Sequence, residues 1–241
     1  MSLSTPKISV LVPSRNREQQ FNKLIKNIYE TVSDLNNIEL LVKLDNDSLY
    51  TLNSKDVFLK SFVSERSESL NRDYYNFLAK EARGQFLFGI GDDVKFLTKN
   101  WDKVLIEKIE AFLINKSDRI AYVSVNEKGS KATHPCFPLI TREAFELLGE
   151  YHCSKLLSWG SDRILWEIYS HPSINRTLHI SDINIEHLSY HDGKAPYDET
   201  ARSMKERFFR DPNCHNLISL YGVPQYRKRI ENYIKEFNKN E

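Results

Sequence analysis

The chain has 241 residues, of which 40% are apolar and 12% aromatic, enough to bury one sizeable core but hardly two independent ones. Lys and Arg number 34 against 33 Asp and Glu, so the formal charge of +1 supplies no strong field to hold polyanions, and non-specific nucleic-acid binding is not expected. Three cysteines without CxxC spacing exclude a disulfide framework and a zinc knuckle, and they fit a reducing cytoplasm.

The first hundred residues alternate between buried-strand and helical patterns. Apolar runs predict strands, and apolar side chains at helical spacing predict a helix before each later strand. The strands are expected at residues 8–12, 38–44 and 85–90, and the helices at residues 21–31 and 74–83, the latter stopped by Gly84. A strand, a helix and a strand imply a parallel βαβ unit. The start of the chain is polar and predicts no signal peptide, and no apolar stretch is long enough to span a bilayer.

Polar side chains follow each of these strands. The first is followed by residues 13–17 (PSRNR), the second ends in Asp45 and Asp47, and the third runs into Asp92 and Asp93. A doubly wound sheet binds its ligands at the carboxyl ends of its strands. Adjacent acids repel one another unless a cation neutralises them, which favours Mg²⁺ or Mn²⁺ carrying phosphates; the alternative is a polar turn that caps the next helix.

Three blocks in this order, ISVLVPSRNR, IELLVKLDNDS and NFLAKEARGQFLFGIGDDV, resemble the family-two, GT-A glycosyltransferases. The resemblance implies an α/β, Rossmann-like nucleotide-sugar-binding fold, with a central, mostly parallel sheet flanked by helices. It also implies one domain over residues 1–241. Residues 1–100 would form the nucleotide-sugar and metal half, 101–205 the acceptor half, and 206–241 a C-terminal helical segment.

The same resemblance implies roles for single residues. Contacts to the nucleotide sugar are expected from Pro13, Ser14, Arg15, Arg17, Asp45, Asp47, Asn76 and Asp92. Gly91 stands where the first acid of the family's D-x-D metal motif is usual, so the metal clamp is either Asp92 with Asp93 or Asp93 alone. Relatives commonly add a late histidine to the metal, and His187 or His191 takes that place here.

The second half resembles the acceptor side of this family. Residues 138–140 predict a strand, Thr141 a helix start, and residues 183–188 a further strand. The segment LSWGSDRILW, residues 157–166, is similar to an acidic motif at a helix start, and it makes Asp162 the candidate general base. The alternative for Asp162 is a helix N-cap. Residues 193–200 resemble a loop that closes over the donor diphosphate, and residues 226–239 predict a basic helix packed on the domain.

These parallels imply an enzyme that uses a divalent metal to transfer a sugar from a nucleoside diphosphate sugar to an acceptor hydroxyl. The donor is expected to be a UDP-sugar, and the reaction is expected to invert the anomeric configuration. Residues 94–102 resemble phage and bacterial members, so a glycan, a protein or a modified nucleic-acid base are all candidate acceptors. A nucleotidyltransferase is an alternative, but residues 13–17 lack the glycine-rich loop usual there. A catalytically silent sugar- or nucleic-acid-binding relative is a second alternative, because Gly91 breaks the D-x-D pattern.

Overall fold

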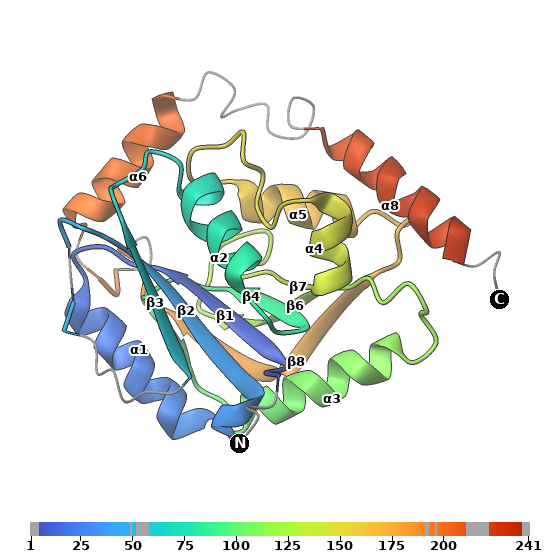
Figure 1. Ribbon diagram of the computed structural model, residues 1–241, viewed down its shortest axis with the longest axis horizontal. Helices are drawn as coiled ribbons and strands as arrows, with labels where there is room; N and C mark the ends of the chain where they lie inside the picture. The colour runs from blue at the N-terminus through green and yellow to red at the C-terminus, as the bar shows by residue number, and fades with distance from the viewer. Residues whose placement is uncertain are drawn as a thin grey trace.

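The chain forms an eight-stranded sheet with helices on both faces (Figure 1). The computed structural model describes residues 5–48, 50–51, 58–190, 193–195, 197–210 and 222–237. The strands are β1 (Ile8–Pro13), β2 (Ile38–Asp45), β3 (Leu59–Ser64), β4 (Phe86–Gly89), β5 (Val94–Phe96), β6 (Tyr122–Lys128), β7 (Leu139–Thr141) and β8 (Thr177–His187). The helices are α1 (Glu18–Thr31), α2 (Asn76–Glu81), α3 (Trp101–Leu113), α4 (Arg142–Leu148), α5 (Ser161–Tyr169), α6 (Glu199–Arg210) and α8 (Val223–Phe237). A short 3-10 helix, Leu35–Asn37, precedes β2, and a π-helical turn, Asn71–Tyr75, leads into α2.

The sheet has the order β3-β2-β1-β4-β7-β6-β8-β5. Strands β3, β2, β1 and β4 are mutually parallel, which confirms the predicted βαβ unit. The second half is mixed, because β7 runs antiparallel to both β4 and β6, and β5 runs antiparallel to β8. Four of the seven pairings are therefore parallel. The carboxyl ends of β1, β2 and β4 meet at one edge of the sheet, where their polar side chains come together.

Two hydrophobic cores lie on the two faces of the sheet. Alternate residues of β1 divide between them: Val10 and Val12 pack under α1 and α3, and Leu11 packs under α2, α4, α5 and α8. Side chains of a β-strand point alternately to opposite faces, so an apolar run interrupted only by Ser9 serves both cores. Phe96 and Trp101 stack in the first core with ring centroids 4.1 Å apart. Both aromatic side chains therefore belong to the scaffold.

Gly84 does not end the helix before it, as was expected, because α2 ends at Glu81 and its C-cap is Ala82. Gly84 has no left-handed backbone conformation; instead, a Cβ built at Gly84 would lie 2.5 Å from the Ser9 hydroxyl oxygen. The Gly84 backbone N–H donates to that same oxygen, 2.8 Å away. The residue therefore lets the α2–β4 turn pack directly on β1.

Several predicted boundaries need correction. Strands β3 and β5 were not expected, and β8 begins at Thr177 rather than near Ile183. The helix start expected at Thr141 is confirmed, since Thr141 is the N-cap of α4; its side chain makes no cap hydrogen bond, because the hydroxyl oxygen accepts the backbone N–H of Ala121 at 3.0 Å. Helix α8 packs on the second core through the buried Ile230, and the predicted helix end at Lys239 lies outside the described residues. Within the described part of the chain, no helix is long and apolar enough to cross a membrane.

Candidate active site

A cavity of about 520 Å³ opens at the carboxyl ends of β1, β2 and β4, within the size range of ligand pockets. The β6–β7 loop, the start of α5, the end of β8 and α6 complete its walls. Nine of the residues expected from the sequence line this cavity: Pro13, Ser14, Arg15, Arg17, Asp45, Asp92, Asp93, Asp162 and His187. The fold thus brings together side chains that are up to 174 positions apart, Pro13 and His187 being the extremes.

Two of the other expected residues, Asp47 and Asn76, do not line the cavity. Asp47 is half exposed and holds Arg15 from outside the cavity wall, with 3.1 Å between the Asp47 carboxylate and the guanidinium. Asn76 is buried, and its amide accepts from the backbone N–H groups of Tyr151 and His152 and donates to the His152 carbonyl oxygen. The Asn76 amide therefore holds the loop behind the cavity, and it is not available to contact a nucleotide sugar. His191 lies outside the described residues.

The end of β2 carries a buried carboxylate. Asp45 is 1% exposed, its Oδ2 lies 3.1 Å from Nε of Arg15, and its Oδ1 accepts the hydroxyl of Tyr74. Burial, followed by this hydrogen bond, raises the pKa of Tyr74 to about 12, so the hydroxyl remains a donor. The pair of Asp45 and Arg15 fixes a charged, hydrogen-bonding wall at this end of the cavity.

The acidic pair after β4 divides into a buried and an accessible carboxylate. Asp92 accepts hydrogen bonds from the Ser14 hydroxyl and from Arg17, and burial together with the neighbouring charge of Asp93 raises its pKa to about 7. Asp93 faces the cavity and lies 3.4 Å from Nε2 of His187. Arg17 bridges the pair, with its guanidinium 3.2 Å from Asp92 and 3.8 Å from Asp93.

This arrangement fits one divalent cation held by few protein groups. Among the described residues, no group of three or more His, Cys, Asp or Glu side chains is placed to hold a metal. Mg²⁺ is usually held by one or two carboxylates together with substrate phosphates and water, and Mn²⁺ accepts the same oxygen ligands, so a cation at Asp93 and His187 would need substrate phosphates or water to complete its coordination.

Gly91 accounts for the departure from the D-x-D pattern. A Cβ at this position would lie 2.3 Å from Oδ1 of Asp93, so a side chain here would displace the Asp93 carboxylate. The glycine leaves that space to Asp93, and the first acid of the usual motif has no counterpart.

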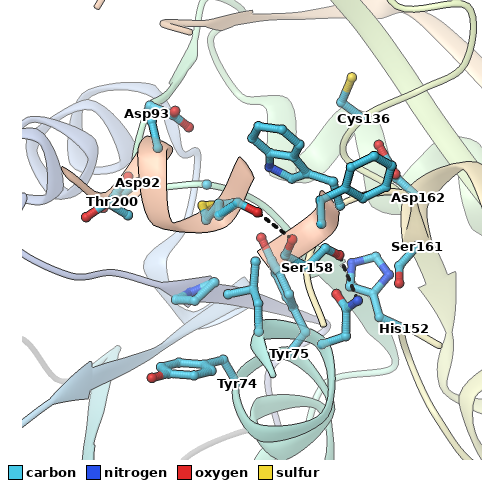
Figure 2. Close-up of a pocket in the computed structure, with 18 of the residues that line it drawn as sticks. Tyr74, Tyr75, Asp92, Asp93, Cys136, His152, Ser158, Ser161, Asp162 and Thr200 are labelled. Atoms are coloured by element: carbon cyan, nitrogen blue, oxygen red, sulfur yellow. Dashed lines mark hydrogen bonds between the residues drawn. The ribbon is translucent and has the colours of Figure 1, made fainter. Parts of the chain in front are cut away.

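Asp162 lies at the opposite end of the cavity from the acidic pair (Figure 2). The N-cap interpretation of this residue is wrong, because α5 begins at Ser161 and its N-cap is Gly160, with a φ of 93°. One carboxylate oxygen of Asp162 lies 3.3 Å from Nε2 of His134, and this hydrogen bond raises the pKa of the imidazole. His134 comes from the β6–β7 loop, and no motif in the sequence pointed to it.

No sequence-family model and no curated protein matches the chain, whereas solved structures match it over almost its whole length. S. aureus TarS 1-349 superposes with a TM-score of 0.57 at 13% identity, covering 98% of this chain and 92% of that one. The mannosyltransferase PcManGT from Pyrobaculum calidifontis, in complex with GDP-Man and Mn²⁺, superposes with a TM-score of 0.56 at 13% identity, covering 97% and 75%. GalNAc-T7 with UDP, GalNAc and Mn²⁺ superposes with a TM-score of 0.58 at 15% identity, covering 97% of this chain and 56% of that one. The chain has the GT-A glycosyltransferase fold.

Within this GT-A fold, two acids at the start of α6 bind the arginines of the loop after β1. Arg17 binds the carboxylate of Asp198 at 2.7 and 2.9 Å, and Arg15 lies 3.4 Å from Glu199. The Thr200 hydroxyl donates to the Arg15 carbonyl oxygen at 3.2 Å. Both arginines of the loop after β1 are therefore attached to α6, a connection that the sequence did not predict.

The cavity wall contains a buried histidine, His152, and we expect it to lower the free energy of unfolding at acidic pH. Burial lowers the pKa of His152 to about 4, against an ordinary value of 6.5. The folded chain binds this proton less readily than the unfolded chain, so His152 costs no stability above pH 6.5 and progressively more down to about pH 4. The difference corresponds to about 3 kcal/mol of unfolding free energy. Denaturant unfolding at several pH values should show a smaller loss between pH 6.5 and 4 for His152→Gln, and an equal loss in both proteins would contradict this assignment.

Proposed function

We propose that the chain is a glycosyltransferase that moves a sugar from a nucleoside diphosphate sugar, most readily a UDP-sugar, to an acceptor hydroxyl. One observation carries the proposal: a single cavity holds Asp93 with His187 and Arg17 at one end and Asp162 at the other. The first end suits a diphosphate, and the second suits the removal of a proton. An enzyme that joins a hydroxyl to an activated sugar needs both.

The donor end is assigned to the strand ends in residues 1–100. We place the base against Asp45 and Arg15, and the diphosphate beside Arg17, whose guanidinium can donate two hydrogen bonds to phosphate oxygens. A divalent cation bound by Asp93 and His187 would neutralise charge on the departing diphosphate. Arg17 adds a fixed positive charge at the same place, which stabilises the leaving group without rearrangement.

The acceptor end is assigned to residues 101–205. Asp162 would take the proton from the acceptor hydroxyl as its oxygen attacks the anomeric carbon. Since Asp162 and the diphosphate-binding groups lie at opposite ends of the cavity, attack from the face opposite the leaving group is favoured, which inverts the anomeric configuration. His134 holds one Asp162 oxygen and leaves the other side of the carboxylate to the substrate.

The structural neighbours support a nucleotide-sugar donor. TarS has been determined with UDP and with UDP-GlcNAc, PcManGT with GDP-Man and Mn²⁺, and GalNAc-T7 with UDP and Mn²⁺. A silent GT-A relative would bind the same donor without turnover, and a nucleotidyltransferase would release pyrophosphate from a nucleoside triphosphate. Product analysis therefore separates the three functions.

Thermal unfolding with a panel of nucleoside diphosphates and their sugars, with and without Mn²⁺, tests the proposal. A ligand at 100 times its dissociation constant stabilises the native state by about 2.7 kcal/mol. For a chain of this size, that corresponds to a rise of the unfolding midpoint by roughly 5–10 °C. We expect such a rise with one nucleotide, larger with Mn²⁺, and slow hydrolysis of the matching sugar donor. Absence of a shift with every member of the panel would refute the proposed donor site.

A further inference from the structure

A second groove, of about 920 Å³, adjoins the donor cavity between the segment after β3 and the outer face of α6. Basic side chains outnumber acidic ones along it. Five cations line the groove against two acids: Arg66, Arg202, Lys205, Arg207 and Arg210 against Glu68 and Glu206. The formal charge of the whole chain is nevertheless near zero, because acidic residues elsewhere balance this local excess of basic residues. The groove is therefore a positively charged surface on a chain that is nearly neutral as a whole.

Two arginines form the wall that the groove shares with the donor cavity. Arg66 and Arg207 line both spaces, as does Ser203. Arg207 is 8% exposed and donates to the Glu68 backbone carbonyl at 3.2 Å, and Arg66 donates to the Ser203 hydroxyl at 2.8 Å. Neither guanidinium forms an ion pair with a carboxylate among the described residues, in contrast to Arg15 and Arg17 across the same cavity.

Burial and the charge of Arg66 lower the pKa of Arg207, and electrostatic interactions with Tyr74, Glu68 and Asp45 offset only part of this effect. Two guanidinium groups that repel each other, one of them buried, are costly unless an anion neutralises them. Arginine is also the residue whose planar fork best matches phosphate oxygens. The shared wall therefore has the chemistry of a phosphate site.

The remaining cations extend this site along α6. Arg202 and Arg210 are exposed and eight residues apart, which corresponds to about 12 Å along the helix. This distance is longer than the reach of a single phosphate group. It matches a chain that carries several phosphate groups in a row. Two half-exposed aromatic side chains, Tyr197 and Phe209, lie in the same groove.

We propose that the groove binds an acceptor that is a phosphodiester chain, whose hydroxyl reaches the donor cavity past the wall of Arg66 and Arg207. This inference rests on the proposed glycosyltransferase function, because it supplies the acceptor for that reaction. The chemistry that the groove recognises is the repeated phosphate of the chain.

The test uses fluorescence anisotropy of a short labelled oligothymidylate, with inorganic polyphosphate as a competitor that lacks bases. The double variant Arg202→Glu, Lys205→Glu changes two exposed residues of the groove. A matched double variant, Lys26→Glu, Lys103→Glu, makes the same change of net charge on α1 and α3, away from the groove. We expect the groove variant to bind at least about 10-fold more weakly, and the slope of log affinity against log salt to fall by roughly 1.4 for two lost contacts. The matched variant should bind as the unchanged protein does, and polyphosphate should compete.

Three outcomes would overturn the inference: no binding of the oligothymidylate, equal losses in the two double variants, or failure of polyphosphate to compete. The last outcome would indicate a site that reads bases. The nucleotide-dependent rise of the unfolding midpoint is measured in the same variants, and it should be unchanged. If that rise persists while chain binding fails, the groove inference alone is wrong; if the rise is absent even from the unchanged protein, the proposed function itself fails.

Discussion

Asp162→Asn is expected to leave donor binding unchanged and to lower the rate of donor turnover by about 10²–10⁴-fold, the usual contribution of a general base. Asparagine keeps the size of the side chain but cannot accept the proton of the attacking hydroxyl. Asp162 lies at the far end of the cavity from Asp93, so the donor contacts should not change. The rate is measured as release of the nucleoside diphosphate from the donor that the thermal panel selects, a reaction in which water can replace the acceptor.

Glu167→Gln is the matched control for this prediction. Glu167 lies on the same helix α5, pairs with Arg163 and Arg227, and does not line the cavity. Its replacement removes one negative charge from the helix without touching the site, so turnover should persist. If Asp162→Asn turns over the donor as fast as Glu167→Gln does, the general base is a different residue.

The parallel half of the sheet was predictable because strands buried on both faces have a distinct sequence pattern. Apolar residues predominate in Ile8–Val12 of β1 and Ile38–Leu44 of β2, which are interrupted by Ser9, Glu39 and Lys43, and both strands are buried along their length. Carboxylates that follow such runs must lie at the carboxyl edge of the sheet. For this reason the amino-acid sequence alone predicts that Asp45, Asp92 and Asp93 share one cavity.

The strands that were not predicted from the sequence, β3 and β5, lack this pattern of buried apolar residues. Strand β3 lies at the edge of the sheet, and Val63 within it is 51% exposed, so its residues show no buried period. Strand β5 has three residues, too few for any periodicity. Short or exposed strands are held by their neighbours in the sheet, and a local pattern cannot report such contacts.

The residues missed at the site depend on contacts between distant segments. His134 meets Asp162 only because the β6–β7 loop folds over α5, and Asp198 meets Arg17 across 181 positions of the chain. The hydrogen bonds of Asn76 also join distant segments, since they bind the loop at residues 151–152, 75 and 76 positions along the chain. Charge and residue type alone could not separate these residues from ordinary surface and turn positions.

Asp93→Ala is expected to abolish the Mn²⁺-dependent part of the donor-induced rise in the unfolding midpoint. Asp93 supplies the carboxylate of the proposed pair with His187, and a single imidazole binds a hard cation weakly. Arg17 keeps its contacts with Asp92 and Asp198 in this variant, so the Mn²⁺-independent binding of the nucleotide should remain. The measurement is thermal unfolding with the selected donor, with and without Mn²⁺, supported by titration of the ion followed by electron paramagnetic resonance.

Asp182→Ala separates this effect from a general loss of negative charge. Asp182 is an exposed acid on β8, 58% accessible and paired with Lys108, and it does not line the cavity. The unfolding midpoint without ligand shows whether either variant has lost stability, and the Mn²⁺ titration is read at a temperature where both are folded. Retention of the Mn²⁺ effect in Asp93→Ala would remove Asp93 from the metal site. It would leave Asp92, which is buried against Ser14 and Arg17, as the acid to test next.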